Sequence, residues 1–207
     1  MTKEEKTKEI IKRLKKIYPH PKTALDFTTP LELLFATILS AQATDKVVNT
    51  ITPELFKKFK TVNDYANSST EDIDAYIRKV NFHNNKAKSI KSAAEMIVAK
   101  HKGMVPDNME DLDALPGVAR KTANVVLGNA FHKAEGIVVD THVMRLSQKL
   151  GLTDKKDPEK IEQDLMQIVP KKDWIDFSHL LILYGREYAP ARPKKDSPKD
   201  ILEDLYV

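Results

Sequence analysis

The most consequential absence in this sequence is cysteine, because none of its 207 residues carries a thiol. The chain can therefore form no disulfide, no thiolate nucleophile and no cysteine-ligated metal or iron–sulfur site. Its six histidines are scattered, and none of them forms the His-x-x-x-His pair of a catalytic zinc helix. We therefore expect neither a metal site nor a cofactor.

Long apolar segments are also missing. No apolar run approaches the roughly 20 residues that a membrane span requires. The first 21 residues, MTKEEKTKEIIKRLKKIYPHP, lack the apolar core of a signal peptide. We expect a cytoplasmic protein with no membrane partner.

The charge balance is only slightly positive. Lys and Arg number 34 against 30 Asp and Glu, a formal net charge of +4, and the pI is about 9.0. Such a balance permits a polyanionic partner without establishing one. With 41% hydrophobic and 31% charged residues, the composition is that of a globular protein of one large domain or two small lobes.

Apolar residues recur at helical spacing through almost the whole chain, which predicts an all-α fold. Pro19 and Pro21 stop the first helix, Pro30 opens a second, and Thr44 or Asp45 caps a third that runs to about residue 59. The second is apolar nearly all round, so we expect it to be buried. Further helices are expected at about 69–80, 86–100, 109–115, 119–131, 141–150, 158–168 and 174–184, with weaker helical character at 201–205. Residues 137–139 would make an isolated strand without a partner, so we interpret them as an extended lead-in to the helix that follows.

The segment LDALPGVARKTA (112–123) places a turn with Gly117 between two helices. Such a turn leaves backbone N–H groups unpaired at the positive end of the second helix, where they suit a phosphate oxygen. A contact of this kind positions DNA without reading its sequence. The spacing is equally compatible with an ordinary helix–turn–helix packing element.

Lys121 falls within about the first turn of that second helix. The helix dipole, the adjacent Arg120 and partial burial would all favour its neutral amine, the form that a nucleophile needs. With 34 Lys and Arg residues in the chain, a solvated surface lysine is the simpler interpretation, and the spacing alone does not overturn it.

Asp140 directly precedes THVMRLSQKLG and is well placed to cap that helix. Capping alone would explain it. The functional alternative is a carboxylate that stabilises positive charge developing on a sugar ring or that transfers a proton. The two roles are compatible, because a capping carboxylate is held rigidly.

Together, LPGVARKTANVVLGNAF and VVDTHVMRL closely resemble the helix–hairpin–helix, glycine/proline-rich loop and catalytic aspartate of the endonuclease III family, which are bifunctional DNA glycosylases and AP lyases. The resemblance extends to LLFATILSAQATDKVVN at 34–49, VNFHNNKAKSI at 80–90 and LLILYGRE at 180–187. It covers about residues 10–188, and the combined motifs are highly specific.

The resemblance implies that Lys121 attacks C1′ of the damaged nucleotide and forms a Schiff base, while Asp140 assists departure of the base and the later proton transfers. The nucleotide must first leave the base stack. Gln42 and Phe82 occupy the family positions that fill the resulting gap, and an amide and an aromatic ring suit that task. Phe82 could also be a core aromatic, but its polar neighbours predict an exposed loop: Asn81, His83, Asn84 and Asn85.

The resemblance also implies a two-lobed architecture with a central cleft. A six-helix barrel-like domain would span 22–134, and 1–21 with 135–207 would form a second lobe, with Lys121 and Asp140 on opposite walls. The expected partner is double-stranded DNA with damaged bases or abasic sites, bound by a monomer associated with the nucleoid. Further expected DNA contacts are Gly117, Ala119, Arg120, Thr122, His142, Arg192, Lys194 and Lys195.

The tail departs from the family pattern. Most members carry a Cys-x6-Cys-x2-Cys-x5-Cys iron–sulfur loop, whereas this tail reads APARPKKDSPKDILEDLYV, with Ala189 at the first ligand position. The end of the lobe must then be held by packing of apolar tail residues: Ile201, Leu202, Leu205 and Tyr206. Basic tail residues could retain the DNA-facing charge of the loop: Arg192, Lys194, Lys195 and Lys199.

Ala119 is a second departure, because the family hairpin usually has glycine there. If the position requires a left-handed backbone, alanine costs about 1–2 kcal/mol, and its methyl group could crowd a phosphate. We predict a weakened but not abolished hairpin contact.

The leading hypothesis is a DNA glycosylase with AP-lyase activity on oxidised pyrimidines. One alternative is a glycosylase of the same superfamily for mismatched or other bases, although those relatives generally lack the lysine at 121. Another is a helix–hairpin–helix DNA-binding protein without catalytic activity. The presence of both Lys121 and Asp140 at matching positions counts against it.

Overall fold

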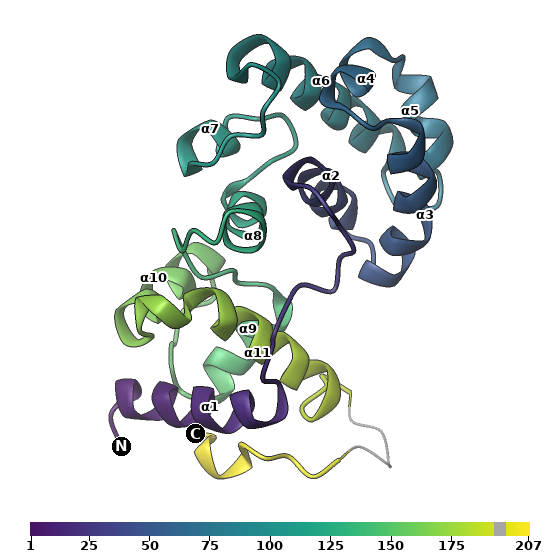
Figure 1. Ribbon diagram of the computed structural model, residues 1–207. Helices are drawn as coiled ribbons and strands as arrows, with labels where there is room; N and C mark the ends of the chain where they lie inside the picture. Colours follow the sequence, from purple (N-terminus) through teal and green to yellow (C-terminus); the bar gives the residue numbers. More distant parts are fainter. Residues whose placement is uncertain (193–197) are drawn as a thin grey trace. The chain divides into compact units, whose positions relative to one another are not determined.

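The computed structural model describes residues 1–192 and 198–207, and within those ranges it contains helices and no β-strand (Figure 1). The predicted all-α fold is confirmed. The chain divides into two compact units, one made of 23–133 and the other of 1–22 with 134–207. None of the described helices is both long and apolar enough to cross a bilayer.

The 23–133 unit is built around one buried helix. Its elements are α2 (Pro30–Ser40), α3 (Asp45–Lys58), α4 (Val62–Asn67), α5 (Thr70–Ile77), α6 (His83–His101), α7 (Met109–Asp113) and α8 (Arg120–Ala130). Every residue of α2 from Leu33 to Leu39 is buried. The helix packs against α3, α6 and α8, as Figure 1 shows. The central burial expected from its apolar sequence is confirmed.

Most helices of this unit begin where a short polar side chain accepts a backbone N–H of the first turn. Thr44, rather than Asp45, caps α3 in this way. Similar caps start other helices: Thr29, Thr61, Ser69 and Asn108. Only α6 and α8, among the described helices of the unit, begin without a side-chain cap.

The start of α6 differs from the sequence prediction. The helix begins at His83 and not near residue 86, because Phe82 takes a left-handed conformation (φ 57°) as its N-cap. The expected loop at 83–85 is therefore wrong, since these residues are helical. Phe82 itself is 60% exposed, so the prediction that it does not belong to the core is confirmed.

The second unit contains α1 (Lys3–Ile17), α9 (Thr141–Lys149), α10 (Pro158–Ile168) and α11 (Trp174–Glu187), with short 3-10 helices η1 (Lys171–Asp173) and η2 (Glu203–Leu205). Residues 137–139 form neither a strand nor a helix, so the prediction that they make no strand is confirmed. The core of the unit is formed by large apolar side chains, among them Ile10, Leu14, Leu146, Leu165, Phe177 and Leu180.

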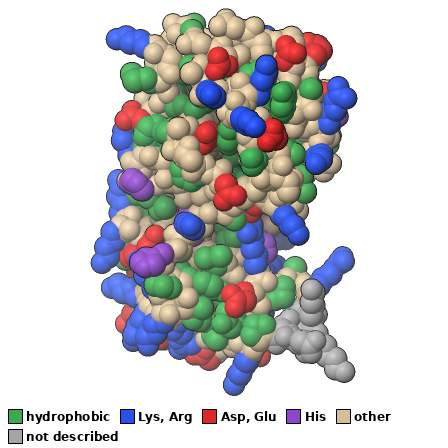
Figure 2. All heavy atoms as spheres, turned by 45° about the vertical axis from the view of Figure 1, so that its right-hand side comes forward, with side chains coloured by type: hydrophobic (Ala, Val, Ile, Leu, Met, Phe, Trp, Pro, Cys, Tyr) green, Lys and Arg blue, Asp and Glu red, His purple; other side chains and the backbone are tan. Residues whose placement is uncertain are grey.

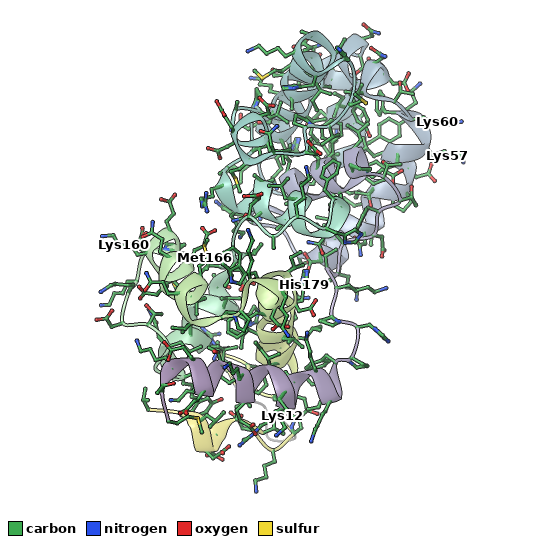
Figure 3. All side chains as sticks on the ribbon, turned by 60° about the vertical axis from the view of Figure 1, so that its left-hand side comes forward. Lys12, Lys57, Lys60, Lys160, Met166 and His179 are labelled. Carbon is green, nitrogen blue, oxygen red and sulfur yellow. The ribbon has the colours of Figure 1, made fainter. Side chains whose placement is uncertain are left out.

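Helix α1 is joined to segments far along the chain. Lys6 Nζ donates to the carbonyl oxygens of Leu150 and Leu205 at 2.9 and 3.0 Å. The Thr7 hydroxyl donates to Ile168 O at 2.8 Å. Farther along the helix, Lys12 projects outward, as Figure 3 shows.

The C-terminal tail is held by packing and by a small polar cluster. Leu202 and Leu205 enter the core while Ile201 and Tyr206 pack against it, so the predicted packing is confirmed. Asp200 accepts hydrogen bonds from the hydroxyls of two tyrosines, Tyr184 and Tyr206, whose oxygens are 2.5 Å apart. Burial and the hydrogen bond to Asp200 raise the pKa of Tyr184, so its hydroxyl stays protonated and can donate. Lys194 and Lys195 lie outside the described residues.

Candidate active site

The hairpin between α7 and α8 depends on Gly117. This residue has φ +79°, a conformation that L side chains rarely adopt. A Cβ atom on it would lie 2.6 Å from the Cβ of Ser89 in α6 and 3.7 Å from Cγ2 of Ile38 in α2. The turn therefore requires glycine both for its backbone conformation and for its close packing against α6.

Ala119 is not strained. Its backbone is extended (φ −118°, ψ 168°), and it serves as the N-cap of α8. The cost that a left-handed backbone would impose on alanine is therefore absent, and that part of the sequence hypothesis is wrong. Because the side chain forms no cap hydrogen bond, it does not compete with an anion for the first N–H groups of α8.

Lys121 is the second residue of α8 and is exposed, while Arg120 and Thr122 are half-buried. The partial burial suggested for Lys121 is thus not found. The side chain is instead accessible to solvent at the positive end of a helix, where a sugar or phosphate can approach it.

Asp140 caps α9, as its sequence position predicts. Its Oδ1 accepts the backbone N–H of Val143 at 2.8 Å, and the residue is half-buried. One carboxylate oxygen is thereby fixed in direction by the helix.

His142 follows in the first turn of α9 and is half-buried. Burial lowers its pKa, the nearby Asp140 opposes that change, and Arg186 and Arg145 lower it further. The neutral imidazole is therefore favoured. Its buried Nδ1 has no hydrogen-bond partner among the described residues.

Gly185 of α11, which the sequence reasoning did not single out, packs directly against His142. A Cβ on it would come within 2.7 Å of His142 Nδ1 and 2.9 Å of Leu146 Cδ1. The available signal was a glycine inside a long apolar helix, which costs about 1 kcal/mol and suggests close packing.

Gln42 and Phe82 lie in neighbouring loops of the 23–133 unit. Both are exposed, and both have left-handed backbones, with φ of 53° and 57°. The side-chain amide of Asn81 donates to Gln42 O at 2.9 Å, which joins the two loops. Such backbone strain in non-glycine residues persists only where the surroundings enforce it, and it is common at functional sites.

The structure distributes the predicted residues over both units. Gln42, Phe82, Gly117 and Lys121 belong to 23–133, whereas Asp140 and His142 belong to the other unit. Arg192 is exposed. On the face shown in Figure 2, basic and acidic side chains are interspersed, in keeping with the modest net charge.

Comparison with known proteins identifies the family. The family model of HhH-GPD superfamily base excision DNA repair proteins matches residues 35–171. Endonuclease III of Synechocystis sp. is 49% identical over 191 residues, covering 92% of this chain and 87% of that protein. Endonuclease III of Escherichia coli (strain K12) is 41% identical over 197 residues, covering 95% and 92%. The chain belongs to the endonuclease III family.

Solved structures agree with this assignment. A trapped endonuclease III–DNA covalent intermediate, in an estranged-adenine complex, has a TM-score of 0.88 and 37% identity, covering 94% of this chain and 92% of that one. A thermostable thymine-DNA glycosylase, at 21% identity, 92% and 91% coverage and a TM-score of 0.82, shares the fold.

The tail residues do not fit the iron–sulfur cluster that most members of this family hold. The first ligand position is Ala189, a buried residue whose carbonyl oxygen accepts from Arg145 at 2.5 Å. With no cysteine in the chain, the thiolates that such a cluster needs are absent. The protein is thus a family variant without the cluster cysteines.

Proposed function

We propose that this protein removes oxidised pyrimidines from duplex DNA, with Lys121 as nucleophile and Asp140 as the assisting carboxylate. Its general activity, base-excision repair by a DNA glycosylase and AP lyase, follows from its membership of the endonuclease III family. The lesion class and the residue roles are the proposal. We further propose that it acts as a monomer on the DNA of the nucleoid.

In the proposed mechanism, the neutral Lys121 amine attacks C1′ of the extruded nucleotide. The glycosidic bond breaks, and its electron pair leaves with the base, which is then protonated. The carboxylate of Asp140 stabilises the positive charge that develops on the sugar. The attached nitrogen then loses a proton, and the C1′–O4′ bond breaks as its electron pair goes to O4′, which is protonated, so that a protonated Schiff base (iminium) forms. The iminium acidifies the 2′ hydrogen, and loss of that proton breaks the C3′–O bond and expels the 3′ phosphate by β-elimination.

The observation that carries this proposal is the place of Lys121. It is exposed at the positive end of α8, four residues after the left-handed Gly117. The hairpin can therefore hold a phosphate while the amine next to it meets the sugar. Asp140 is held at the start of α9 in the other unit.

We assign the gap left by the extruded nucleotide to Gln42 and Phe82, whose exposed side chains are free to enter it. The remaining proposed DNA contacts of the described residues are Gly117, Ala119, Arg120, Thr122, His142 and Arg192.

Borohydride trapping on a duplex with an abasic site tests the nucleophile. The wild type should form a covalent adduct, and Lys121→Gln should form none. The matched control is Lys88→Gln, which changes an exposed lysine on α6 of the same unit and should trap like the wild type. Absence of a wild-type adduct, or an undiminished adduct with Lys121→Gln, would contradict the mechanism.

The rate of base excision tests the role of the Asp140 carboxylate. Asp140→Asn keeps an oxygen that can cap α9 but removes the negative charge. It should slow base excision by about 10²-fold or more while leaving the melting temperature nearly unchanged. Equal excision rates would reduce Asp140 to a helix cap.

Single-turnover excision from four duplexes then tests the lesion class: thymine glycol, dihydrouracil, a mismatch and 8-oxoguanine. The two oxidised or reduced pyrimidines should be excised fastest. Faster excision of a mismatched or purine base would favour the alternative glycosylase activity.

A further inference from the structure

Lys86 is a buried lysine, with only 6% of its surface exposed. Its ammonium donates to the carbonyl oxygens of Leu39 and Ala41, at 2.8 and 2.5 Å. These carbonyls lie at the C-terminal end of α2, where backbone oxygens lack helical partners and carry partial negative charge. Burial lowers the pKa of Lys86, and the two carbonyl oxygens supply hydrogen bonds in place of water.

The position of Lys86 links the two loops described above. Gln42 comes directly after Ala41, so the side chain of Lys86 fixes the start of the Gln42 loop. Its backbone N–H donates to Phe82 O at 3.0 Å and so fixes the first turn after Phe82. The hydrogen bond from the Asn81 side chain to Gln42 O joins the residue before Phe82 directly to the Gln42 loop.

Both loops need this support, because Gln42 and Phe82 hold left-handed conformations that cost free energy in non-glycine residues. His83, the residue after Phe82, is held in turn by Asp74, whose Oδ1 lies 2.5 Å from its Nδ1. The backbones that carry the two exposed side chains are therefore held by side-chain hydrogen bonds from Lys86, Asn81 and Asp74, all within one unit.

We propose that Lys86 is a positioning residue for lesion recognition, which holds the Gln42 and Phe82 loops at a fixed separation before DNA binds. The inference rests on the proposed function, in which these two side chains occupy the gap left by the extruded nucleotide. Lys86 does not touch DNA. It removes the need to order two loops at the moment of binding.

The informative quantity is lesion discrimination, defined as the ratio of dissociation constants for an undamaged duplex and for the same duplex with a tetrahydrofuran abasic-site analogue. Lys86→Met keeps the chain length and removes the donors. It should reduce this ratio about tenfold while leaving affinity for undamaged DNA unchanged, because undamaged DNA has no gap to fill. Lys86→Arg keeps donors for the carbonyls and should restore most of the ratio.

Lys91 provides a matched control on the same helix. Its ammonium also donates to two carbonyl oxygens at the C-terminal end of a helix, Ala66 O and Ser68 O of α4 and its C-cap, both at 2.9 Å. These two hydrogen bonds and its ion pair with Glu95 on the same helix involve neither the Gln42 nor the Phe82 loop. Lys91→Met therefore removes the same charge and a similar structural contact, and should leave the discrimination ratio unchanged.

A double-mutant cycle adds a test that general destabilisation does not mimic. In a Phe82→Ala background, Lys86→Met should reduce the ratio by less than it does alone, because the side chain that it positions is already missing. Circular dichroism shows whether Lys86→Met is folded. If it is not, Asn81→Ala, which removes the hydrogen bond between the same two loops, takes its place in these comparisons.

Two failures can be told apart. If the wild type discriminates and traps, but Lys86→Met (or Asn81→Ala) matches Lys91→Met in the ratio, the positioning role is overturned and the proposed function stands. If the wild type neither discriminates nor forms a borohydride adduct, the proposed function itself fails.

Discussion

Two turn glycines of the 23–133 unit share a backbone conformation but differ in their surroundings. Gly103 and Gly117 have φ of +77° and +79°. A Cβ on Gly103 would meet only Val62 Cγ1, at an ordinary 3.6 Å, whereas on Gly117 it would collide with Ser89 at 2.6 Å. The pair therefore separates the cost of a left-handed backbone from the cost of lost space.

We predict that Gly103→Ala lowers the free energy of unfolding by about 1–2 kcal/mol, the cost of a left-handed alanine. Gly117→Ala should lose about 1–3 kcal/mol more, because the hairpin must also move away from α6. Urea denaturation measures both. Only Gly117→Ala should weaken binding to an abasic duplex. Equal losses of unfolding free energy in the two variants would show that the turn does not need the close contact between Gly117 and Ser89.

The sequence predicts the structural role of some residues and not of others. The capping role of Asp140 was predictable, because an N-cap is a signal within three residues. The burial of Lys86 was not, since its two carbonyl partners lie 47 and 45 residues away and nearby lysines on α6 look alike in sequence. The left-handed backbone of Phe82 is likewise imposed by contacts and carries no local signature.

At the scale of elements, helix starts marked by caps were easier to place than starts without them. Helix α6 begins earlier than predicted because its N-cap is Phe82, which offers no acceptor. Helix α4 was not predicted, although Thr61 and Asp64 form a capping box that signals its start. Helix α11 continues past the predicted end at Tyr184 to Glu187.

Two kinds of polar contact hold the C-terminal tail, a tyrosine–carboxylate cluster and a surface ion pair. The Asp200 carboxylate accepts hydrogen bonds from the hydroxyls of Tyr184, which is buried, and Tyr206, which is half-buried. By contrast, Asp204 pairs with Arg13 at 2.7 Å, and 61% of the Asp204 side chain is exposed.

We predict that Asp200→Ala lowers the free energy of unfolding by about 1–3 kcal/mol, because two tyrosine hydroxyls lose their acceptor. Asp204→Ala should cost at most about 1 kcal/mol, as is usual for an exposed ion pair. Thermal and urea unfolding of the two variants compare them directly. A larger loss for Asp204→Ala would mean that the surface pair, and not the tyrosine cluster, anchors the tail.

At the scale of the whole molecule, DNA affinity depends on which charges reach phosphates. Replacing Lys194 and Lys195 together by alanine should weaken binding and flatten the slope of log K against log salt by about 1.8, the value for two phosphate contacts. This prediction depends on the sequence of the tail. Binding titrations from low to moderate salt measure it.

The control for this slope is the pair Lys57, in the last turn of α3, and Lys60, just after that helix. Both are exposed, Figure 3 labels them, and they belong to none of the proposed contacts. Replacing both by alanine removes the same net charge and should leave the slope nearly unchanged. An equal slope change in the two double variants would indicate a general effect of net charge.

The long-range bonds of α1 also order events during synthesis. Lys6 and Thr7 bond to residues between 144 and 199 positions farther along the chain. At about 5–20 residues per second, a translating ribosome delivers the last of these partners roughly 10–40 s after α1 has emerged. By then all the core residues of the 23–133 unit have been synthesised. Helix α1 is therefore synthesised well before the partners that cover it, and its apolar face stays exposed until residues near 205 have been made.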